Sequence, residues 1–165
     1  MWLHDVIVED AILYDLAART KEEALAELVG ALEKAGRLSR PEEAVRDLIV
    51  RERAGGTGVG GGIAIPHACT GAVHQPMAAI GRSGAGIDFN AFDGSKAHYI
   101  FLLLNGTGGD TLQLRILARL AKLIREQDLA GCLRESFTGK TFLDLFEERE
   151  RILGEIESGK DLPSV

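Results

Sequence analysis

The chain has 165 residues, of which 45% are hydrophobic and 27% are charged, as in an average soluble globular protein. A chain of this length can bury a sizeable core without disulfide or metal staples. Its formal net charge of -6 argues against a nucleic-acid-binding or anionic-membrane-binding surface, because such surfaces need clustered Lys and Arg.

The sequence also indicates a cellular location. Two cysteines, Cys69 and Cys132, are too few for a disulfide framework, which favours a reducing compartment. The first residues lack the basic and apolar regions of a secretory signal. The longest strongly apolar stretch, residues 99–104, is far shorter than the roughly 20 residues of a membrane helix. We therefore expect a cytoplasmic protein that does not insert into a membrane.

Two helices are predicted in the first third of the chain. Thr20 and Glu23 form a capping box, and apolar residues at helical spacing follow it as far as Gly36, which suits a helix end. Pro41 fits the first turn of a second helix, which is expected to run to about Ala54.

Three strands are predicted in the middle of the chain. Residues 63–65 read as a buried strand that Pro66 ends or places at a sheet edge. Residues 76–82 and 99–104 predict two further strands. Phe89 and Phe92, in the turn-rich segment between those two, are expected to point inward.

The last third is predicted to be helical. A helix beginning near Asp110 has its apolar face within residues 114–124, and further helices are expected at 128–134 and 141–157. Because helices and strands mix along the whole chain, we predict a single α/β domain with helices covering a mainly hydrophobic sheet. The domain is expected to span residues 1–158, followed by a flexible tail at 159–165.

The glycines are unevenly distributed. The chain contains 20, and six of them fall between Gly55 and Gly62. Residues 56–61 formally match a dinucleotide-binding pattern, but that pattern requires a strand before it and a helix after it, and the predicted order here is reversed. The cluster instead indicates positive φ angles or positions where another group packs closely against the backbone. A functional loop is favoured over a flexible hinge that binds no ligand.

His67 directly follows the apolar strand at 63–65. A histidine there can serve proton transfer, metal binding or covalent chemistry, although a lone histidine is more often structural. The spacing of His67, Cys69 and His74 matches no common zinc pattern. A nucleophilic pair of Cys69 with one of these histidines stays open, whereas a Ser-His-Asp hydrolase lacks a supporting G-x-S-x-G motif.

The segment RERAGGTGVGGGIAIPH, residues 51–67, closely resembles the active-site segment of enzyme IIA domains of the bacterial phosphoenolpyruvate-dependent phosphotransferase system. The similarity is to the fructose/mannitol type, which includes nitrogen-regulatory members. It continues through residues 86–94, the apolar strand at 100–104 and the helix at 114–124. The resemblance implies an α/β domain with a central mixed β-sheet flanked by helices.

The resemblance also implies a phosphoryl relay without a metal or cofactor. His67 would accept a phosphoryl group from a histidine phosphocarrier protein, and Arg51 is the matching family arginine. A neutral imidazole is a good nucleophile, and phosphoryl transfer mainly needs positioning and charge stabilisation. An arginine fork supplies that charge. Arg53 is the nearer basic alternative, but it is expected on another helix face. The predicted catalytic residues are therefore His67 and Arg51.

The remaining predicted site residues would bind phosphate. Thr57 offers a hydroxyl, and Gly58, Gly60 and Gly62 offer backbone N–H groups for an anion nest. Gln113 occupies the position where family members commonly have a second histidine, and its amide can donate a hydrogen bond but cannot become cationic. A further departure is Gly56, which stands where many members have serine.

Three roles are compatible with this pattern. A nitrogen-regulatory-type protein, whose phosphorylation changes its binding to a regulatory target, is favoured, because added phosphoryl charge can switch an interface. A sugar-transport component would instead pass the group to a cysteine of a separate IIB domain. Loss of the second histidine leaves open a non-catalytic binding module.

Overall fold

The computed structural model describes residues 2–135 and 141–159. The chain divides into two compact units. The larger unit comprises Val6–Gln113, and the smaller unit combines Met1–Asp5 with Leu114–Val165.

The larger unit contains a mixed six-stranded sheet. Its strands are β1 (Ile7–Leu13), β2 (Gly58–Gly60), β3 (Ile63–Ala64), β4 (His67–Thr70), β5 (Met77–Ile87) and β6 (Ala97–Gly106). They are arranged in the order β1-β5-β6-β3-β2, with β4 also paired to β6. The β1–β5, β3–β6 and β4–β6 pairs are parallel, whereas the β2–β3 and β5–β6 pairs are antiparallel. The predicted central mixed sheet is thus confirmed.

Strand β6 aligns two short strands along one edge. Ile63 of β3 pairs with Tyr99, and His67 of β4 pairs with Leu103. Between them Pro66 has no N–H to donate, but its carbonyl oxygen accepts the N–H of Leu103. His67 therefore begins a strand whose register is fixed by the rigid centre of the sheet.

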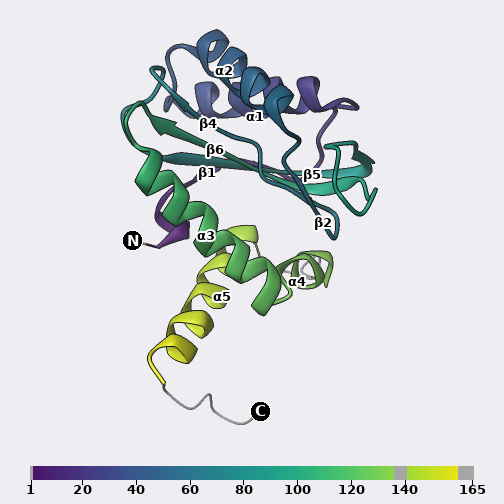
Figure 1. Cartoon of the computed structure of the whole chain (residues 1–165), viewed down its shortest axis with the longest axis vertical. Helices are drawn as coiled ribbons and strands as arrows, with labels where there is room; N and C mark the ends of the chain where they lie inside the picture. Colours follow the sequence, from purple (N-terminus) through teal and green to yellow (C-terminus); the bar gives the residue numbers. More distant parts are fainter. Residues whose placement is uncertain (1, 136–140, 160–165) are drawn as a thin grey trace. The chain divides into compact units, whose positions relative to one another are not determined.

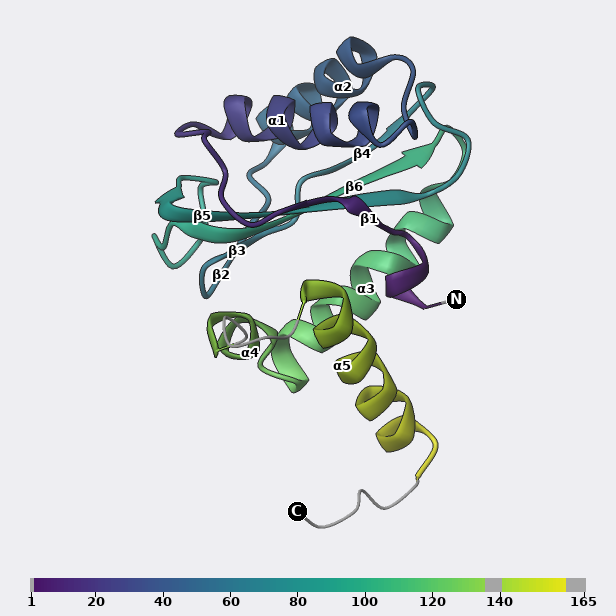
Figure 2. The same cartoon turned by 180° about the vertical axis from the view of Figure 1, so that it is seen from behind.

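Helices α1 (Lys21–Lys34) and α2 (Pro41–Ala54) lie side by side over one face of this sheet (Figure 1; Figure 2). α1 begins with the predicted capping box, in which Thr20 accepts the N–H of Glu23. α1 contacts β1 and β5, while α2 contacts β4. α2 is consequently held close to the strand that carries His67.

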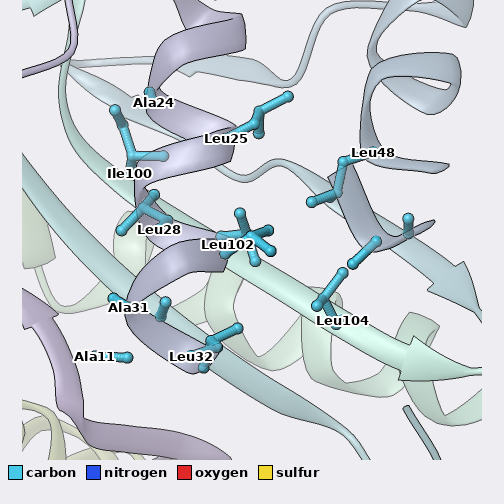
Figure 3. Packing of buried hydrophobic residues seen from close by; sticks show 14 of the residues in the cluster. Ala11, Ala24, Leu25, Leu28, Ala31, Leu32, Leu48, Ile100, Leu102 and Leu104 are labelled. Carbon is cyan, nitrogen blue, oxygen red and sulfur yellow. The ribbon is translucent and has the colours of Figure 1, made fainter. Parts of the chain in front are cut away.

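The core of the larger unit lies between these helices and the sheet. Leu25 and Leu28 of α1, Leu48 of α2 and Leu102 of β6 point into the same layer (Figure 3) and are at most 1% exposed. Each such leucine contributes about 2 kcal/mol by leaving water. The packing gives α2 and β4 a rigid base.

The smaller unit is helical. It comprises a short 3-10 helix at Leu3–Asp5, most of α3 (Asp110–Glu126), α4 (Leu129–Glu135) and α5 (Phe142–Glu157). Glu150 of α5 is fully buried and accepts the backbone N–H groups of Leu3 and His4. The partly exposed His4 ring also lies 2.7 Å from this carboxylate. None of the helices within the described residues is long and apolar enough to cross a membrane.

The predicted helices and the three predicted strands are present, whereas β1, β2 and β4 were not predicted. One expectation for the loop before β6 is also wrong. Phe89 is buried as expected, but Phe92 is fully exposed. Phe92 lies in a tight turn closed by the hydrogen bond from the Gly94 N–H to the Ala91 oxygen, and its side chain points into solvent. The proposed domain limits, 1–158, stay a prediction, and the tail lies outside the described residues from residue 160 onward.

Candidate functional site

His67 is half-buried at the start of β4, and one of its ring nitrogens has a defined partner. Nδ1 lies 2.7 Å from the main-chain oxygen of Ile65. A carbonyl oxygen only accepts hydrogen bonds, so Nδ1 carries the proton. The lone pair of the neutral ring is therefore on Nε2, which makes Nε2 the nucleophilic atom.

The surroundings of His67 favour the neutral ring. Burial lowers its pKa below the ordinary value, and the positive charge of Arg51 lowers it further. The hydrogen bond to Ile65 and the negative charge of Glu52 oppose this shift, but the net direction is downward. Because only the neutral imidazole is nucleophilic, His67 is available for reaction at neutral pH.

Arg51 lies in the last turn of α2 and approaches the same site. Its Nη1 donates to the main-chain oxygen of Gly55 at 3.0 Å, which holds the guanidinium at the helix end. Arg51 and Arg53 line different grooves, as their helical spacing predicts. Of the two, Arg51 shares its groove with residues of β4.

Glu52 follows Arg51 on α2 and is only 4% exposed. One carboxylate oxygen accepts the N–H of Thr57 at 3.0 Å, and the other accepts the Thr57 hydroxyl at 2.6 Å. The hydroxyl expected to bind phosphate is thus engaged with Glu52 in this state, and phosphate binding by Thr57 stays a prediction. Glu52 was not predicted to be a site residue, although it lies within the motif at residues 51–67.

Close packing explains two glycines of the loop. A Cβ added at Gly56 would lie 2.7 Å from the main-chain oxygen of Phe89, and one at Gly58 would lie 2.9 Å from the same atom. The N–H of Gly58 donates to this oxygen. The expected close backbone approach is confirmed, and the Gly58 N–H already has a partner other than phosphate.

Positive φ angles explain the glycines that follow. Gly60, Gly61 and Gly62 have φ values of 85°, 63° and 86°, in the region that favours glycine. The N–H of Gly61 donates to Asp93 at 3.0 Å. The hydrogen bond from the Ser95 hydroxyl, together with those from the Gly61 and Ser95 N–H groups, lowers the pKa of Asp93 to about 2. Phosphate binding by Gly58, Gly60 and Gly62 stays a prediction.

Gln113 lies in the first turn of α3, within the larger unit. Its Oε1 accepts from the Cys69 thiol at 3.4 Å, and Asp110 accepts from the same thiol at 3.5 Å. Burial and Asp110 raise the pKa of Cys69. Cys69 is partly exposed, and its thiol is oriented towards the polar residues that begin α3.

An open groove of about 820 Å³ connects these residues. Its lining includes Arg51 from α2, Cys69 from β4 and Gln113 from α3. Side chains two apart on a strand share a face, so Cys69 and His67 project to the same side of β4. The groove thus places Arg51 and Gln113 beside Cys69, the β4 residue that shares a face of the strand with His67.

The other cysteine and histidine candidates do not converge on a metal site. Within residues 2–135 and 141–159, no group of three His, Cys, Asp or Glu side chains is arranged to hold a metal ion. His98 lies within β6, where its Nδ1 is 2.9 Å from the main-chain oxygen of Ser83.

The family comparison agrees with this geometry. A family model described as "Phosphoenolpyruvate-dependent sugar phosphotransferase system, EIIA 2" matches residues 5–149. The chain is 38% identical over 129 residues to the PTS system fructose-specific EIIA component of Haloferax volcanii, covering 78% of this chain and 84% of that protein. It is also 38% identical over 138 residues to a nitrogen regulatory protein of Bradyrhizobium diazoefficiens, covering 82% and 88% respectively.

Longer proteins and solved structures extend the comparison. Over 151 residues the chain is 30% identical to the PTS system fructose-specific EIIABC component of Bacillus subtilis, covering 92% of this chain but only 24% of that protein. The crystal structure of nitrogen regulatory protein IIA-Ntr from Neisseria meningitidis superposes with a TM-score of 0.73 at 28% identity, covering 90% of this chain and 97% of that one. Sequence and fold therefore agree on one family.

Proposed function

The chain belongs to the EIIA 2 family of the phosphoenolpyruvate-dependent sugar phosphotransferase system, and on that premise we propose that it carries a phosphoryl group on Nε2 of His67. The hydrogen bond from Nδ1 of His67 to the oxygen of Ile65 supports this assignment most directly. It leaves Nε2 with the lone pair, while the lowered pKa keeps the ring neutral.

The proposed step is an in-line transfer between two histidines. The Nε2 lone pair of His67 attacks phosphorus in the phosphohistidine of a donor protein, and a new N–P bond forms. The donor's N–P bond breaks, and its electron pair returns to the donor's ring nitrogen. Nδ1 of His67 keeps its proton, and the oxygen of Ile65 stabilises the resulting positive ring. No proton has to leave His67 during transfer.

Arg51 is proposed to stabilise the transferring group. Its guanidinium influences the charge state of His67 and lines the adjoining groove, where a planar fork of N–H donors suits phosphoryl oxygens. Gln113 is proposed to donate from its amide nitrogen, because its amide oxygen already accepts from Cys69. Thr57, Gly58, Gly60 and Gly62 are kept as secondary phosphate-binding candidates.

The proposed donor is a histidine phosphocarrier protein, and the favoured downstream partner is a regulatory target. The similarity to nitrogen regulatory proteins over most of both chains supports that choice. The equally similar fructose-specific EIIA component supports the second candidate, a transport component that passes the group to a IIB cysteine. A cytoplasmic location stays a prediction.

The proposal is tested by incubating the protein with phosphoenolpyruvate, enzyme I and the histidine phosphocarrier protein, followed by intact-mass measurement. We expect an acid-labile gain of one phosphoryl group in the wild type and none in His67→Ala. An unmodified wild type beside a fully phosphorylated carrier would overturn the relay and favour a binding module. Adding a purified IIB domain then distinguishes transport from regulation, because only a transport component discharges to it.

A further inference from the structure

Glu52 is a buried charged group for which the phosphoryl relay described above has no direct use. It is 4% exposed and lies next to Arg51 on the last turn of α2. Burying a carboxylate is costly unless hydrogen bonds and opposite charge compensate for lost water. The contacts that offset the cost of burying the Glu52 carboxylate therefore indicate the structural role of this residue.

Most of those contacts come from one residue of the glycine loop. Thr57 donates its N–H to Oε1 at 3.0 Å and its hydroxyl to Oε2 at 2.6 Å. The ammonium of Lys21 lies 3.9 Å from Oε1 and donates to Asn90 at 2.8 Å. Both carboxylate oxygens are thus directed at Thr57, with a lysine on one side.

The hydrogen bonds continue from Thr57 to the acceptor histidine. The main-chain oxygen of Thr57 accepts the N–H of Ile65 at 3.0 Å. The oxygen of Ile65 accepts from Nδ1 of His67 at 2.7 Å. Three consecutive hydrogen-bonding steps therefore join the Glu52 carboxylate on α2 to the His67 imidazole on β4, by way of Thr57 and Ile65.

We propose that Glu52 is a positioning residue for His67, which acts through Thr57 and Ile65 to fix the peptide that holds Nδ1–H. The inference rests on the proposed function, because the choice of ring tautomer matters to the reaction only if Nε2 is the nucleophile. Glu52 does not touch the transferring group. Glu52 anchors the start of the glycine loop to α2, the helix that carries Arg51. It thereby fixes the position of His67 relative to Arg51.

Substitutions at Glu52 separate positioning from charge. Glu52→Gln keeps an oxygen that accepts the Thr57 N–H and gains an amide that donates to the Thr57 hydroxyl. Glu52→Ala removes both contacts. Thr57→Val removes only the hydrogen bond from the Thr57 hydroxyl to Glu52. It therefore tests the same contact through the donor instead of the acceptor. Glu22→Gln, at an exposed position in the first turn of α1, is the matched control for loss of one negative charge.

The first readout is the ¹⁵N NMR spectrum of the His67 imidazole in the unphosphorylated protein, for variants whose amide spectra show a folded protein. We expect the Nδ1–H tautomer in the wild type, Glu22→Gln and Glu52→Gln. In Glu52→Ala and Thr57→Val the ratio of Nδ1–H to Nε2–H tautomer should fall roughly two- to tenfold, the range of one ordinary hydrogen bond. An unchanged ratio in Thr57→Val, or in a folded Glu52→Ala, would overturn the proposal.

The second readout is the rate of phosphorylation by a saturating phosphocarrier donor. The Glu52→Ala rate should fall below that of Glu22→Gln, because the less restrained imidazole presents Nε2 to the donor less often, and Glu52→Gln should restore most of the rate. Equal loss in both Glu52 variants would also overturn the positioning role, since it would indicate a need for charge alone. The tautomer measurement uses no donor, so a failed relay in the wild type leaves this test of Glu52 intact and separately interpretable.

Discussion

Nδ1 of His67 lies 2.7 Å from the main-chain oxygen of Ile65, two residues earlier in the chain. This contact fixes the ring tautomer, because the oxygen can only accept. The contact spans Pro66, which has no N–H to donate and lies between β3 and β4. One local hydrogen bond thus selects which nitrogen is free to react.

The pH dependence of His67 follows from its lowered pKa. A depressed pKa means that the ring gains its proton only below the ordinary value of about 6.5, so the nucleophilic neutral form persists to lower pH. Proton NMR titration of the His67 ring should give a midpoint below the ordinary histidine pKa of about 6.5. A midpoint above that ordinary value would contradict the described environment.

Replacing Arg51 by alanine should slow phosphorylation and raise the pKa of His67. Loss of a preorganised charged donor lowers phosphoryl-transfer rates by on the order of 10², and the Arg51 charge lowers the His67 pKa in the wild type. Single-turnover transfer from the phosphocarrier measures the rate, and ring titration measures the pKa. Arg53→Ala removes the same charge from an exposed position of α2, and equal effects in the two variants would refute the role of Arg51.

Changing Gln113 should alter transfer without altering the acceptor. Gln113→Ala removes one amide donor and should slow phosphorylation by roughly two- to tenfold. Gln113→Glu should slow it more, because a carboxylate repels the phosphoryl oxygens. Gln75→Glu, at an exposed turn position, controls for added charge. Rates equal to the wild type in both Gln113 variants would place Gln113 outside the phosphoryl site.

A methyl group at Gly56 should destabilise the larger unit. The added Cβ would lie 2.7 Å from the Phe89 oxygen and 2.8 Å from Cβ of Asn90, and overpacking of this kind costs about 1–3 kcal/mol. Urea unfolding of Gly56→Ala should show this loss. Gly84→Ala is the control, because nothing lies within 4 Å of a Cβ at Gly84. Equal stability of the two variants would show that the loop adjusts freely.

Much of the fold could be predicted from local sequence signals. Thr20 and Glu23 determine the start of α1 by their reciprocal hydrogen bonds, and the apolar run of β6 marks the sheet centre. The glycine cluster correctly indicated positive φ angles and close approach. These features depend on residues that are close together in the sequence, so they can be predicted from the sequence alone.

Features that depend on distant neighbours could not be predicted in the same way. Gly56 must be small because of Phe89, and nothing in the sequence pairs these two positions. Glu52 is buried because Thr57 and Lys21 satisfy it, whereas a carboxylate on a charged helix normally faces water. The motif predicted His67 and Arg51 as site residues. The hydrogen bonds that orient His67 could be identified only in the three-dimensional structure.

The most direct test is to identify the phosphorylated nitrogen. The protein is phosphorylated through enzyme I and the phosphocarrier protein, and the modified ring is then assigned by ¹⁵N and ³¹P NMR. The structure predicts a phosphoryl group on Nε2 of His67, with Nδ1 still protonated and hydrogen-bonded to Ile65. Phosphorylation on Nδ1, or on any residue other than His67, would contradict the account.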